Sequence, residues 1–354
     1  MKIRPYEDSD QAAWDDYVMS HPSGTFFHLS GWKEMVEKSF GHKSYYLLAM
    51  SSLASSSSET EALKTKILGV FPAFSTKSLF FGRSMVSLPF ATYGGILAEN
   101  EEAEQALYEE AVALTKAKRL DYLEIRNESK PLADLPVKDL YYVFKKEISS
   151  DNDENLKAIP RKSRRMVRKG IGNELHAAFG GIELLNQFYE LFAFSYRGFG
   201  TPVFSKGYLK NLLKRFRKDS SILIISKDGK PLSGVLSFYF KDQVIPYYSG
   251  AYPESHKYAA NDYLYWVLMC SAAESGCRVF DFGRSKKDTG PYHFKQHWGF
   301  EPRPLPYQYF LHKTEAIPDI SPANPKYHRR IEVWKKLPLW ATKIIGPRIV
   351  KYIP

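Results

Sequence analysis

The stretch that decides the fold reads FDFGRS at residues 280–285, followed by GPYHFKQHWGF at residues 290–300. The first part predicts a short apolar strand that breaks at Gly283, and the second predicts a charged loop that brings aromatic and basic side chains together. Loops that leave the ends of buried strands often carry functional sites, because the sheet holds them rigidly. A packed surface turn, with Trp298 and Phe300 in the core, is the alternative explanation.

The order of predicted elements repeats in the two halves of the chain. Each half has a helix, two strands, a glycine-containing connection, a long helix and a last strand. These elements are residues 30–40, 45–50, 66–74, 92–97, 103–119 and 122–126 in the first half, and 206–217, 222–226, 232–240, 248–253, 262–275 and 278–282 in the second. The sequence LEIR at 123–126 also matches FDFGR at 280–284. Two α/β units related by duplication are the simplest explanation.

The composition restricts the class of protein. The chain has 354 residues with 44% hydrophobic and 25% charged residues, which is typical of an ordered globular protein of one large or two smaller domains. Its formal net charge of +11 predicts an anionic partner, namely a nucleic acid, a phosphorylated substrate or a membrane surface. Cys270 and Cys277 suggest neither a metal site nor a disulfide framework. With no apolar signal segment and no stretch of membrane-spanning length, we expect a cytoplasmic protein without a bound metal.

The second half contains the run F-K-x-x-W-G-F, formed by Phe294, Lys295, Trp298, Gly299 and Phe300. On this run the chain resembles the FemAB-type aminoacyl- and acyltransferases. It looks closest to the FemAB-like proteins associated with exosortase/PEP-CTERM systems and exopolysaccharide loci. The resemblance is specific in the second half and diffuse in the first.

This resemblance implies an α/β (α+β) fold of two tandem GNAT-like units, each a mixed sheet flanked by helices. The expected first unit is residues 1–150, and the second, with the active-site cleft, is residues 151–313. Residues 314–354 are expected to form a basic amphipathic appendage. A Ser-rich stretch at residues 51–58 is predicted to be a hairpin loop.

The resemblance also implies site residues. Lys295 stands at the position of the family's functional lysine, and a fixed cation near an ester carbonyl stabilises the oxyanion that forms in aminoacyl transfer. Arg284 is expected to hold an anionic part of a substrate, with Asp281 as its buried partner. Further substrate-binding residues are expected to be Arg197, Tyr248, Tyr292, Phe294 and Trp298. For Arg197 and Tyr248, a helix-end contact and a place at the core edge are the structural alternatives.

Residues 155–170 are predicted to form a basic helix that bridges the two halves. Arg161, Arg164, Arg165 and Arg168 share one face, without acidic residues at four-residue spacing to offset their charge. Guanidinium groups match phosphate oxygens, so aminoacyl-tRNA, a nucleotide-linked sugar and an anionic lipid are candidate partners. A solvated surface face is the alternative.

The expected donor follows from a departure from the GNAT pattern. GNAT enzymes bind the CoA pyrophosphate on a glycine-rich loop at the start of the helix that corresponds to residues 257–275. Here residues 253–262 read PESHKYAAND, without glycine, and Asn261 or Asp262 is predicted to cap the helix. We therefore expect no tightly bound cofactor, with aminoacyl-tRNA as the donor and acyl-CoA as the alternative.

The C-terminal residues 326–354 combine cations with apolar residues, among them Trp334 and Trp340. Pro338 and Pro347 divide this stretch, so it cannot span a bilayer as one helix. It is predicted to bind the anionic inner face of the cytoplasmic membrane, or else to fold back and bury its apolar side on the second unit.

These patterns predict an acyl- or aminoacyltransferase that forms an amide bond on a cell-envelope precursor, such as one of peptidoglycan or exopolysaccharide. A CoA-dependent N-acyltransferase on the same fold is the first alternative. A non-catalytic protein that binds RNA or an anionic glycolipid through the arginine helix is the second.

Overall fold

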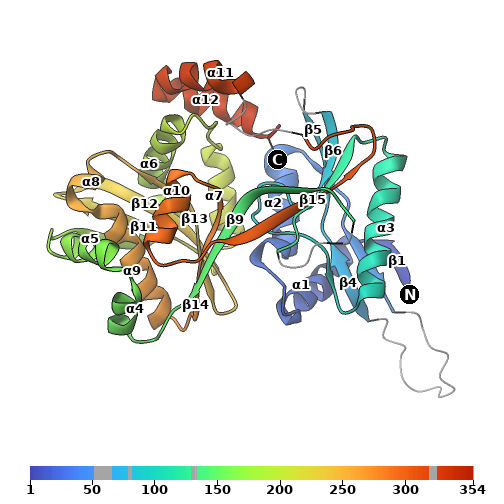
Figure 1. Ribbon diagram of the computed structural model, residues 1–354, viewed down its shortest axis with the longest axis horizontal. Coiled ribbons are helices and arrows are strands. Elements are labelled where there is room, and N and C mark those ends of the chain that lie inside the picture. The colour runs from blue at the N-terminus through green and yellow to red at the C-terminus, as the bar shows by residue number, and fades with distance from the viewer. Residues whose placement is uncertain (52–65, 79–81, 129–131, 133, 319–324, 354) are drawn as a thin grey trace. The chain divides into compact units, whose positions relative to one another are not determined.

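The computed structural model describes residues 1–51, 66–78, 82–128, 132, 134–318 and 325–353 (Figure 1). The hairpin loop predicted at residues 51–58 lies, apart from Ser51, outside the described residues. The chain separates into two compact units. Unit 1 comprises Met1–Asp139 and Leu305–Pro318, and unit 2 comprises Leu140–Pro304 and the chain from residue 319 to Ile353.

Unit 1 contains two groups of paired strands. The first has the order β1 (Lys2–Pro5), β3 (Leu47–Met50), β4 (Ile67–Phe71) and β7 (Leu97–Ala98). The second has the order β15 (Arg303–Leu311), β8 (Tyr122–Ile125), β6 (Gly82–Val86), β5 (Phe74–Ser78) and β2 (Lys43–Ser44). All these pairs are antiparallel except β6 with β8.

The helices of unit 1 cover these strands. They are η1 (Asp8–Asp10), α1 (Gln11–Ser20), η2 (Phe26–His28), α2 (Ser30–Phe40) and α3 (Glu101–Ala117). Apolar residues recur along α3 at Ala103, Leu107 and Ala111, which is the spacing of one helix face. That face is fully buried in one core cluster with residues of β3, β4 and β8. Asn100 begins the helix, because its side chain accepts a hydrogen bond from the backbone N–H of Ala103 at 2.9 Å.

Unit 2 is built on one mixed sheet. Its strand order is β10 (His176–Gly180), β11 (Ser220–Lys227), β12 (Lys230–Phe240), β13 (Gln243–Ala251), β14 (Val279–Lys286) and β9 (Val137–Glu147). Only β13 and β14 run parallel. Its helices are α4 (Asn152–Ala158), α5 (Arg161–Ile171), η3 (Ile182–Leu184), α6 (Leu185–Gly198), α7 (Lys206–Arg215), α8 (Ser255–Tyr258), α9 (Ala260–Glu274), α10 (Gly290–His297), α11 (Pro325–Lys336) and α12 (Leu339–Val350).

Alternation along β12 places helices on both faces of this sheet. Val235 is buried in a cluster with Leu264 and Leu268 of α9. The neighbouring Gly234 faces α6 instead, where an added Cβ would lie 3.2 Å from the Leu191 side chain. The predicted α/β class, with mixed sheets flanked by helices, is confirmed.

Two strands cross over between the predicted halves. The strand β9 follows the first predicted half in sequence but pairs in unit 2, and β15 follows the second predicted half but pairs in unit 1. Residues 141–147 of β9 pair antiparallel with β14 in unit 2, and residues 308–311 of β15 pair antiparallel with β8 in unit 1. Neither strand belongs to the repeated order of predicted elements. The boundaries of the two units therefore differ from the predicted divisions at residues 150 and 313.

Three local predictions were wrong. Residues 290–297 form the helix α10 rather than a loop, because Thr289 precedes it in an extended conformation and Pro291 stands in its first turn. The predicted basic helix is divided into α4 and α5, since Pro160 cannot continue a helix from α4. Residues 248–251, predicted as a connection, complete β13.

The C-terminal segment packs on unit 2, with α11 and α12 beside α6 (Figure 1). A Cβ added at Gly200 would lie 2.4 Å from Ile331, and one added at Gly346 would lie 2.8 Å from the backbone of Val203. Lys343 of α12 forms an ion pair with Glu190 of α6. The expected break at Pro338 separates α11 from α12, whereas Pro347 lies inside α12. Among the described helices, none has both the length and the apolar character needed to cross a membrane.

Candidate functional site

The candidate site is built on an irregularity in β14. This strand pairs with β9, but the register shifts between Asp281 and Arg284. Gly283 lies within the shift and has a φ of +65°, a left-handed conformation that glycine adopts without a steric penalty. On its other side, the described pairing of β14 with β13 is confined to Val279 and Phe280. The carbonyl groups of residues 282–284 thus lie beyond the part of β14 that pairs with β13.

The ammonium group of Lys295 forms hydrogen bonds with all three of these carbonyls. Its Nζ donates hydrogen bonds to the backbone oxygens of Phe282, Gly283 and Arg284 at 2.7, 3.2 and 3.1 Å. The side chain belongs to α10, is 8% exposed, and lies over the ring of Phe144 with Nζ 5.3 Å from its centroid. Burial lowers the pKa of Lys295 to about 7, while Asp281 opposes this shift and Arg284 adds to it. Lys295, the lysine that the sequence motif indicated, is thus a buried cation at the end of β14.

Asp281 is fully buried beside this lysine. One carboxylate oxygen accepts a hydrogen bond from the backbone N–H of Gly283 at 2.7 Å, which fixes the shifted part of β14. The other oxygen lies 3.5 Å from Nζ of Lys145 on β9. Asp281 is therefore buried and paired with Lys145, a partner that the sequence did not indicate, whereas the partner expected from the sequence was Arg284.

Arg284 lies at the end of this group and is half-buried. Its guanidinium group is 4.7 Å from the ring centroid of Tyr141, a distance that suits a cation–π contact. Burial raises the pKa of Tyr196 on α6, and the positive charge of Arg284 opposes that shift. Tyr248 of β13 is buried, with its hydroxyl 3.2 Å from that of Tyr208. The structure thus brings Lys295 and Arg284 together, while Tyr248 belongs to a buried ring cluster.

The remaining predicted substrate-binding residues are placed by packing contacts. Tyr292 is buried, with its ring 5.3 Å from that of Phe144, and Phe294 packs on Tyr265 at 5.6 Å. Trp298 is fully buried, and its Nε1 donates to Asp262 at 3.1 Å. The helix α9 begins at Ala260 with Ala259 before it, so Asp262 lies within its first turn and the prediction that Asn261 or Asp262 caps this helix was wrong.

Arg197, predicted to bind substrate, lies in the last turn of α6. Its guanidinium group donates to the backbone oxygen of Leu337 at 3.4 Å and lies 5.1 Å from the ring of Phe194. The described contacts of Arg197 thus hold the connection between α11 and α12 against unit 2.

The four predicted anion-binding arginines lie on α5, whose two faces differ sharply. One face carries Ser163, Val167 and Gly170, which are buried. Its contact with α9 is so close that a Cβ added at Gly170 would lie 2.7 Å from Tyr263 and 3.2 Å from the Ala259 oxygen. The other face consists of Arg161, Arg165 and Arg168, which are exposed, and Arg164, which is half-buried. The helix α5 as a whole has six basic residues and no acidic residue.

The same packing decides whether the residues fit CoA. In GNAT enzymes the pyrophosphate is bound by the N-terminus of the helix at the position of α9. Here Ala259 and Ala260 at that end are buried, and α5 lies directly against them. Asn173, just after α5, donates a hydrogen bond to the backbone oxygen of Tyr258 at 2.9 Å and so joins the end of α5 to the residues that precede α9. Asp262 in the first turn adds a carboxylate where an anion would lie. These residues do not fit the pyrophosphate of CoA at this helix end.

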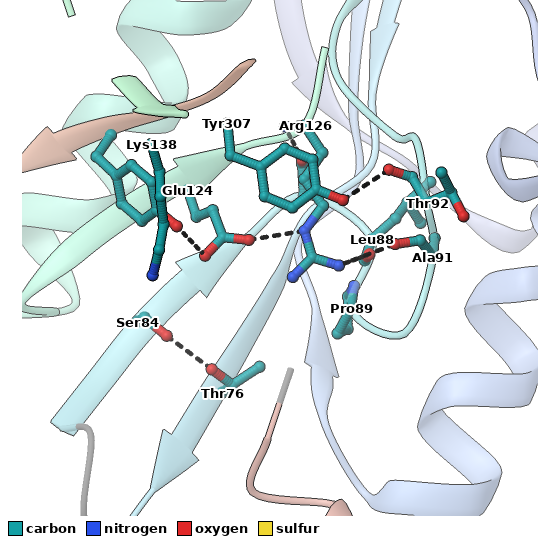
Figure 2. Close-up of polar contacts among 12 residues, drawn as sticks. Thr76, Ser84, Leu88, Pro89, Ala91, Thr92, Glu124, Arg126, Lys138 and Tyr307 are labelled. Carbon is teal, nitrogen blue, oxygen red and sulfur yellow. Dashed lines mark hydrogen bonds and ion pairs between the residues drawn. The ribbon is translucent and has the colours of Figure 1, made fainter. Parts of the chain in front are cut away.

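Unit 1 has a counterpart of this strand end that the sequence analysis did not assign to a site (Figure 2). Glu124 and Arg126 of the matching LEIR sequence are each 2% exposed, and Arg126 Nε donates to Glu124 at 2.7 Å. Nη1 of Arg126 also donates to the backbone oxygens of Leu88 and Ala91 at 3.2 and 3.1 Å. The match between LEIR at 123–126 and FDFGR at 280–284 was the sequence signal that could have indicated this pair, because each motif places an acid and an arginine at the end of a strand.

Comparisons with known proteins agree with this architecture. Residues 155–296, which lie within unit 2, match the acetyltransferase (GNAT) domain family. No curated protein matches the chain. Among solved structures, FemX is similar with a TM-score of 0.66 and 16% identity over 94% of this chain and 100% of that one.

Two further structures share the fold. The C-terminal domain of a putative lysylphosphatidylglycerol synthetase from Agrobacterium fabrum has a TM-score of 0.54 and 12% identity over 85% of this chain and 91% of that one. A tandem GNAT protein from the clavulanic acid biosynthesis pathway has a TM-score of 0.52 and 9% identity over 89% of this chain and 99% of that one. Residues 155–296 therefore match a GNAT-type acyltransferase domain, and the chain as a whole shares the fold of FemX and of a tandem GNAT protein.

Proposed function

We propose that this acyltransferase moves an aminoacyl group from aminoacyl-tRNA to an amine of a cell-envelope or exopolysaccharide precursor. The observation that carries the proposal is the position of α5. Its small-residue face closes the helix end where CoA would bind, and its arginine face is turned to solvent. A donor with an extended phosphate backbone suits such a surface better than a single buried pyrophosphate.

The proposed reaction joins the amine to the carbonyl carbon of the aminoacyl ester. The new C–N bond forms as the ester C–O bond breaks, the tRNA hydroxyl leaves, and the amine loses a proton. Lys295 is the proposed catalytic residue, with its ammonium charge stabilising the oxyanion of the tetrahedral intermediate. All three of its protons point at carbonyl oxygens in the resting structure, so one of these bonds is exchanged for the oxyanion during transfer. Arg284 holds an anionic part of a substrate.

The first test measures single-turnover transfer from a labelled aminoacyl-tRNA pool to precursor-derived amines. Lys295→Met should lower the rate by roughly 10²- to 10³-fold, because the fixed cation is lost from a buried site. The control is Lys146→Met, which removes a neighbouring half-buried lysine of β9 whose Nζ donates to the oxygen of Ala158. Full activity of a folded Lys295→Met variant would remove Lys295 from the mechanism.

A second test separates the donor from the chemistry. Replacing Arg161, Arg165 and Arg168 by alanine should weaken tRNA binding and flatten its dependence on salt. Replacing Lys210, Lys214 and Arg217, which are exposed on and just after α7, removes the same charge elsewhere in unit 2 and serves as the control. Equal tRNA affinity of the two variants contradicts the α5 proposal. Salt-dependent RNA binding without any transfer favours the non-catalytic binder, and transfer from acyl-CoA favours the CoA-dependent alternative.

An anionic membrane surface is the second partner that we propose, because the outer face of the C-terminal helices combines apolar and basic side chains. Val333, Trp340 and Ile344 are 62%, 67% and 54% exposed, although the opposite face of α12 packs on α6. Exposed cations on the same two helices include Lys336 and Arg348. Tryptophan and cations together suit the headgroup region, and a lipid-linked acceptor would be reached there.

Vesicle co-sedimentation tests this partner. Trp340→Ser with Ile344→Ser should reduce binding to vesicles rich in phosphatidylglycerol, while pure phosphatidylcholine vesicles should bind neither protein. Phe179→Ser with Ile182→Ser, which replaces two other exposed apolar residues of unit 2, is the matched control. Equal sedimentation of the two variants contradicts membrane binding by α12.

A further inference from the structure

Unit 1 contains a cavity of its own, with a volume of about 260 Å³. Its walls come from the connection between α1 and α2, from residues 93–98, from the first turn of α3, and from Asn127 and Glu128 after β8. Such a volume holds a group much larger than one water molecule or a bare ion. The cavity uses none of the residues assigned above to aminoacyl transfer.

The wall at residues 93–98 is held in place by buried polar contacts. Arg126 and Tyr307 donate to the oxygens of Ala91 and Thr92 at 3.1 and 2.8 Å, which fixes the chain as it enters this wall (Figure 2). Asn127 Oδ1 then accepts from the backbone N–H of Ile96 at 3.0 Å. A Cβ added at Gly95 would lie only 1.5 Å from that same oxygen. The wall is therefore preformed, as expected of a binding site.

Two histidines line the cavity, and hydrogen bonds tie both rings to its wall. The backbone N–H of Ser23 donates to Nδ1 of His21, and Nε2 of the same ring lies 3.2 Å from the oxygen of Ala98. Nε2 of His28 lies 3.1 Å from the oxygen of Gly95, and its Nδ1 lies 2.8 Å from the hydroxyl of Thr25. The other charged side chains of the lining are carboxylates.

Those carboxylates are Glu101, Glu104 and Glu128, and no lysine or arginine is among the described residues that line the cavity. The positive end of the α3 dipole, which would otherwise attract an anion, already has acidic side chains in its first turn. A phosphate or carboxylate ligand would be repelled. Within the described residues, no group of histidine, cysteine and acidic side chains is arranged to hold a metal ion. The charge is therefore suited to an organic cation.

We infer that unit 1 binds a small organic cation, with an alkylammonium or guanidinium group held between the glutamates of this cavity. Carboxylates supply acceptors for the N–H groups of such a ligand, and the fixed wall limits its size. The site is distinct from the transfer chemistry proposed for Lys295, so either proposal can fail without the other.

Calorimetric titration of the full-length protein with 1,5-diaminopentane at low salt tests this inference. We expect saturable one-to-one binding, with at least tenfold lower affinity in Glu104→Gln with Glu128→Gln. Glutarate, a dianion of the same chain length, should not bind. The control is Glu102→Gln with Glu109→Gln, which removes the same charge from exposed positions of α3 outside the lining. The two single variants at Glu104 and Glu128 serve the same purpose if the double variant does not fold.

Three results would overturn the inference: no saturable binding of the diamine, equal affinity in the cavity and control variants, or binding of glutarate as strong as that of the diamine. Stoichiometric binding of Mg²⁺ or Zn²⁺ that displaces the diamine would replace it with a metal site.

Discussion

The strand ends of β8 and β14 hold matching sequences but use them differently. In β8, the carboxylate of Glu124 and the guanidinium of Arg126 are both buried and paired with each other. In β14, the acid Asp281 is buried, whereas Arg284 is half-exposed and a second cation, Lys295, comes from α10. The left-handed Gly283 accounts for the difference, since it inserts a register shift between the acid and the arginine. One copy of the strand end is built for structure, and the other presents charge.

Arg126→Met, at the strand end of β8, should cause the largest loss of stability. Arg126→Met leaves the Glu124 carboxylate buried beside the hydroxyl of Tyr309, 2.9 Å away, without its cation. Removing one member of a buried pair costs about 3–5 kcal/mol in free energy of unfolding, which urea denaturation would measure. Glu124→Gln with Arg126→Met should recover part of that loss. A change below about 1 kcal/mol for the single variant would contradict the structural role.

The second effect concerns the pH dependence of stability on the β14 side. The folded-state pKa of Lys295 is about 7, below the ordinary value of about 10.4 for the unfolded chain. The unfolded state then binds more protons between these values, so the stability contribution of this group rises with pH across that window. The slope is roughly 1.4 kcal/mol per pH unit at most, and below pH 7 the cost of burying the charge is fully present. Lys295→Met should remove this slope, and an unchanged slope would mean that the lysine is not buried as a cation.

A third prediction concerns Gly283, which lies within the register shift of β14. Gly283→Ala places a side chain at a φ of +65°, which costs about 1–2 kcal/mol. Gly229→Ala carries the same kind of strain, at a φ of +74° in an open turn of unit 2. The two variants should lose similar stability, but only Gly283→Ala should slow aminoacyl transfer, because it moves the carbonyls that Lys295 binds. Equal transfer rates in both would separate the shift from the chemistry.

The smallest expected effect on stability is that of Arg284→Met. Its guanidinium is half-buried beside Tyr141, so the free energy of unfolding should change by only about 0.5–1 kcal/mol. If Arg284 holds an anionic substrate, the variant should instead raise KM for the precursor with little change in kcat. A loss of stability as large as that of Arg126→Met would erase the contrast between the two strand ends.

Much of the fold could be predicted from local sequence, because periodic segments specify their own structure. The helix expected at residues 30–40 is Ser30–Phe40, and the long helix expected at 262–275 is Ala260–Glu274. The strands β9 and β15 were missed because each is defined by pairing with residues distant in sequence. The short α10 was also missed, since eight residues with two aromatics give a weak helical signal.

The candidate site was harder to predict than the fold. The motif indicated Lys295 and Arg284, but it did not indicate that Lys295 binds carbonyls of its own unit's strand or that Lys145 pairs with Asp281. Those contacts depend on a register shift and on β9, neither of which has a local sequence pattern. The placement of α5 over α9 is likewise set by tertiary packing of Gly170, whereas its charge could be seen in the sequence.

The late position of β15 has a consequence for synthesis of the chain. Residues 308–311 complete the sheet of unit 1 against β8, yet the ribosome makes them after most of unit 2. Until then the growing chain carries β8 with an open edge, the kind of edge that invites pairing with other chains. Folding of unit 1 therefore ends late in translation, and a nascent chain stalled before residue 308 exposes this edge to pairing with other chains.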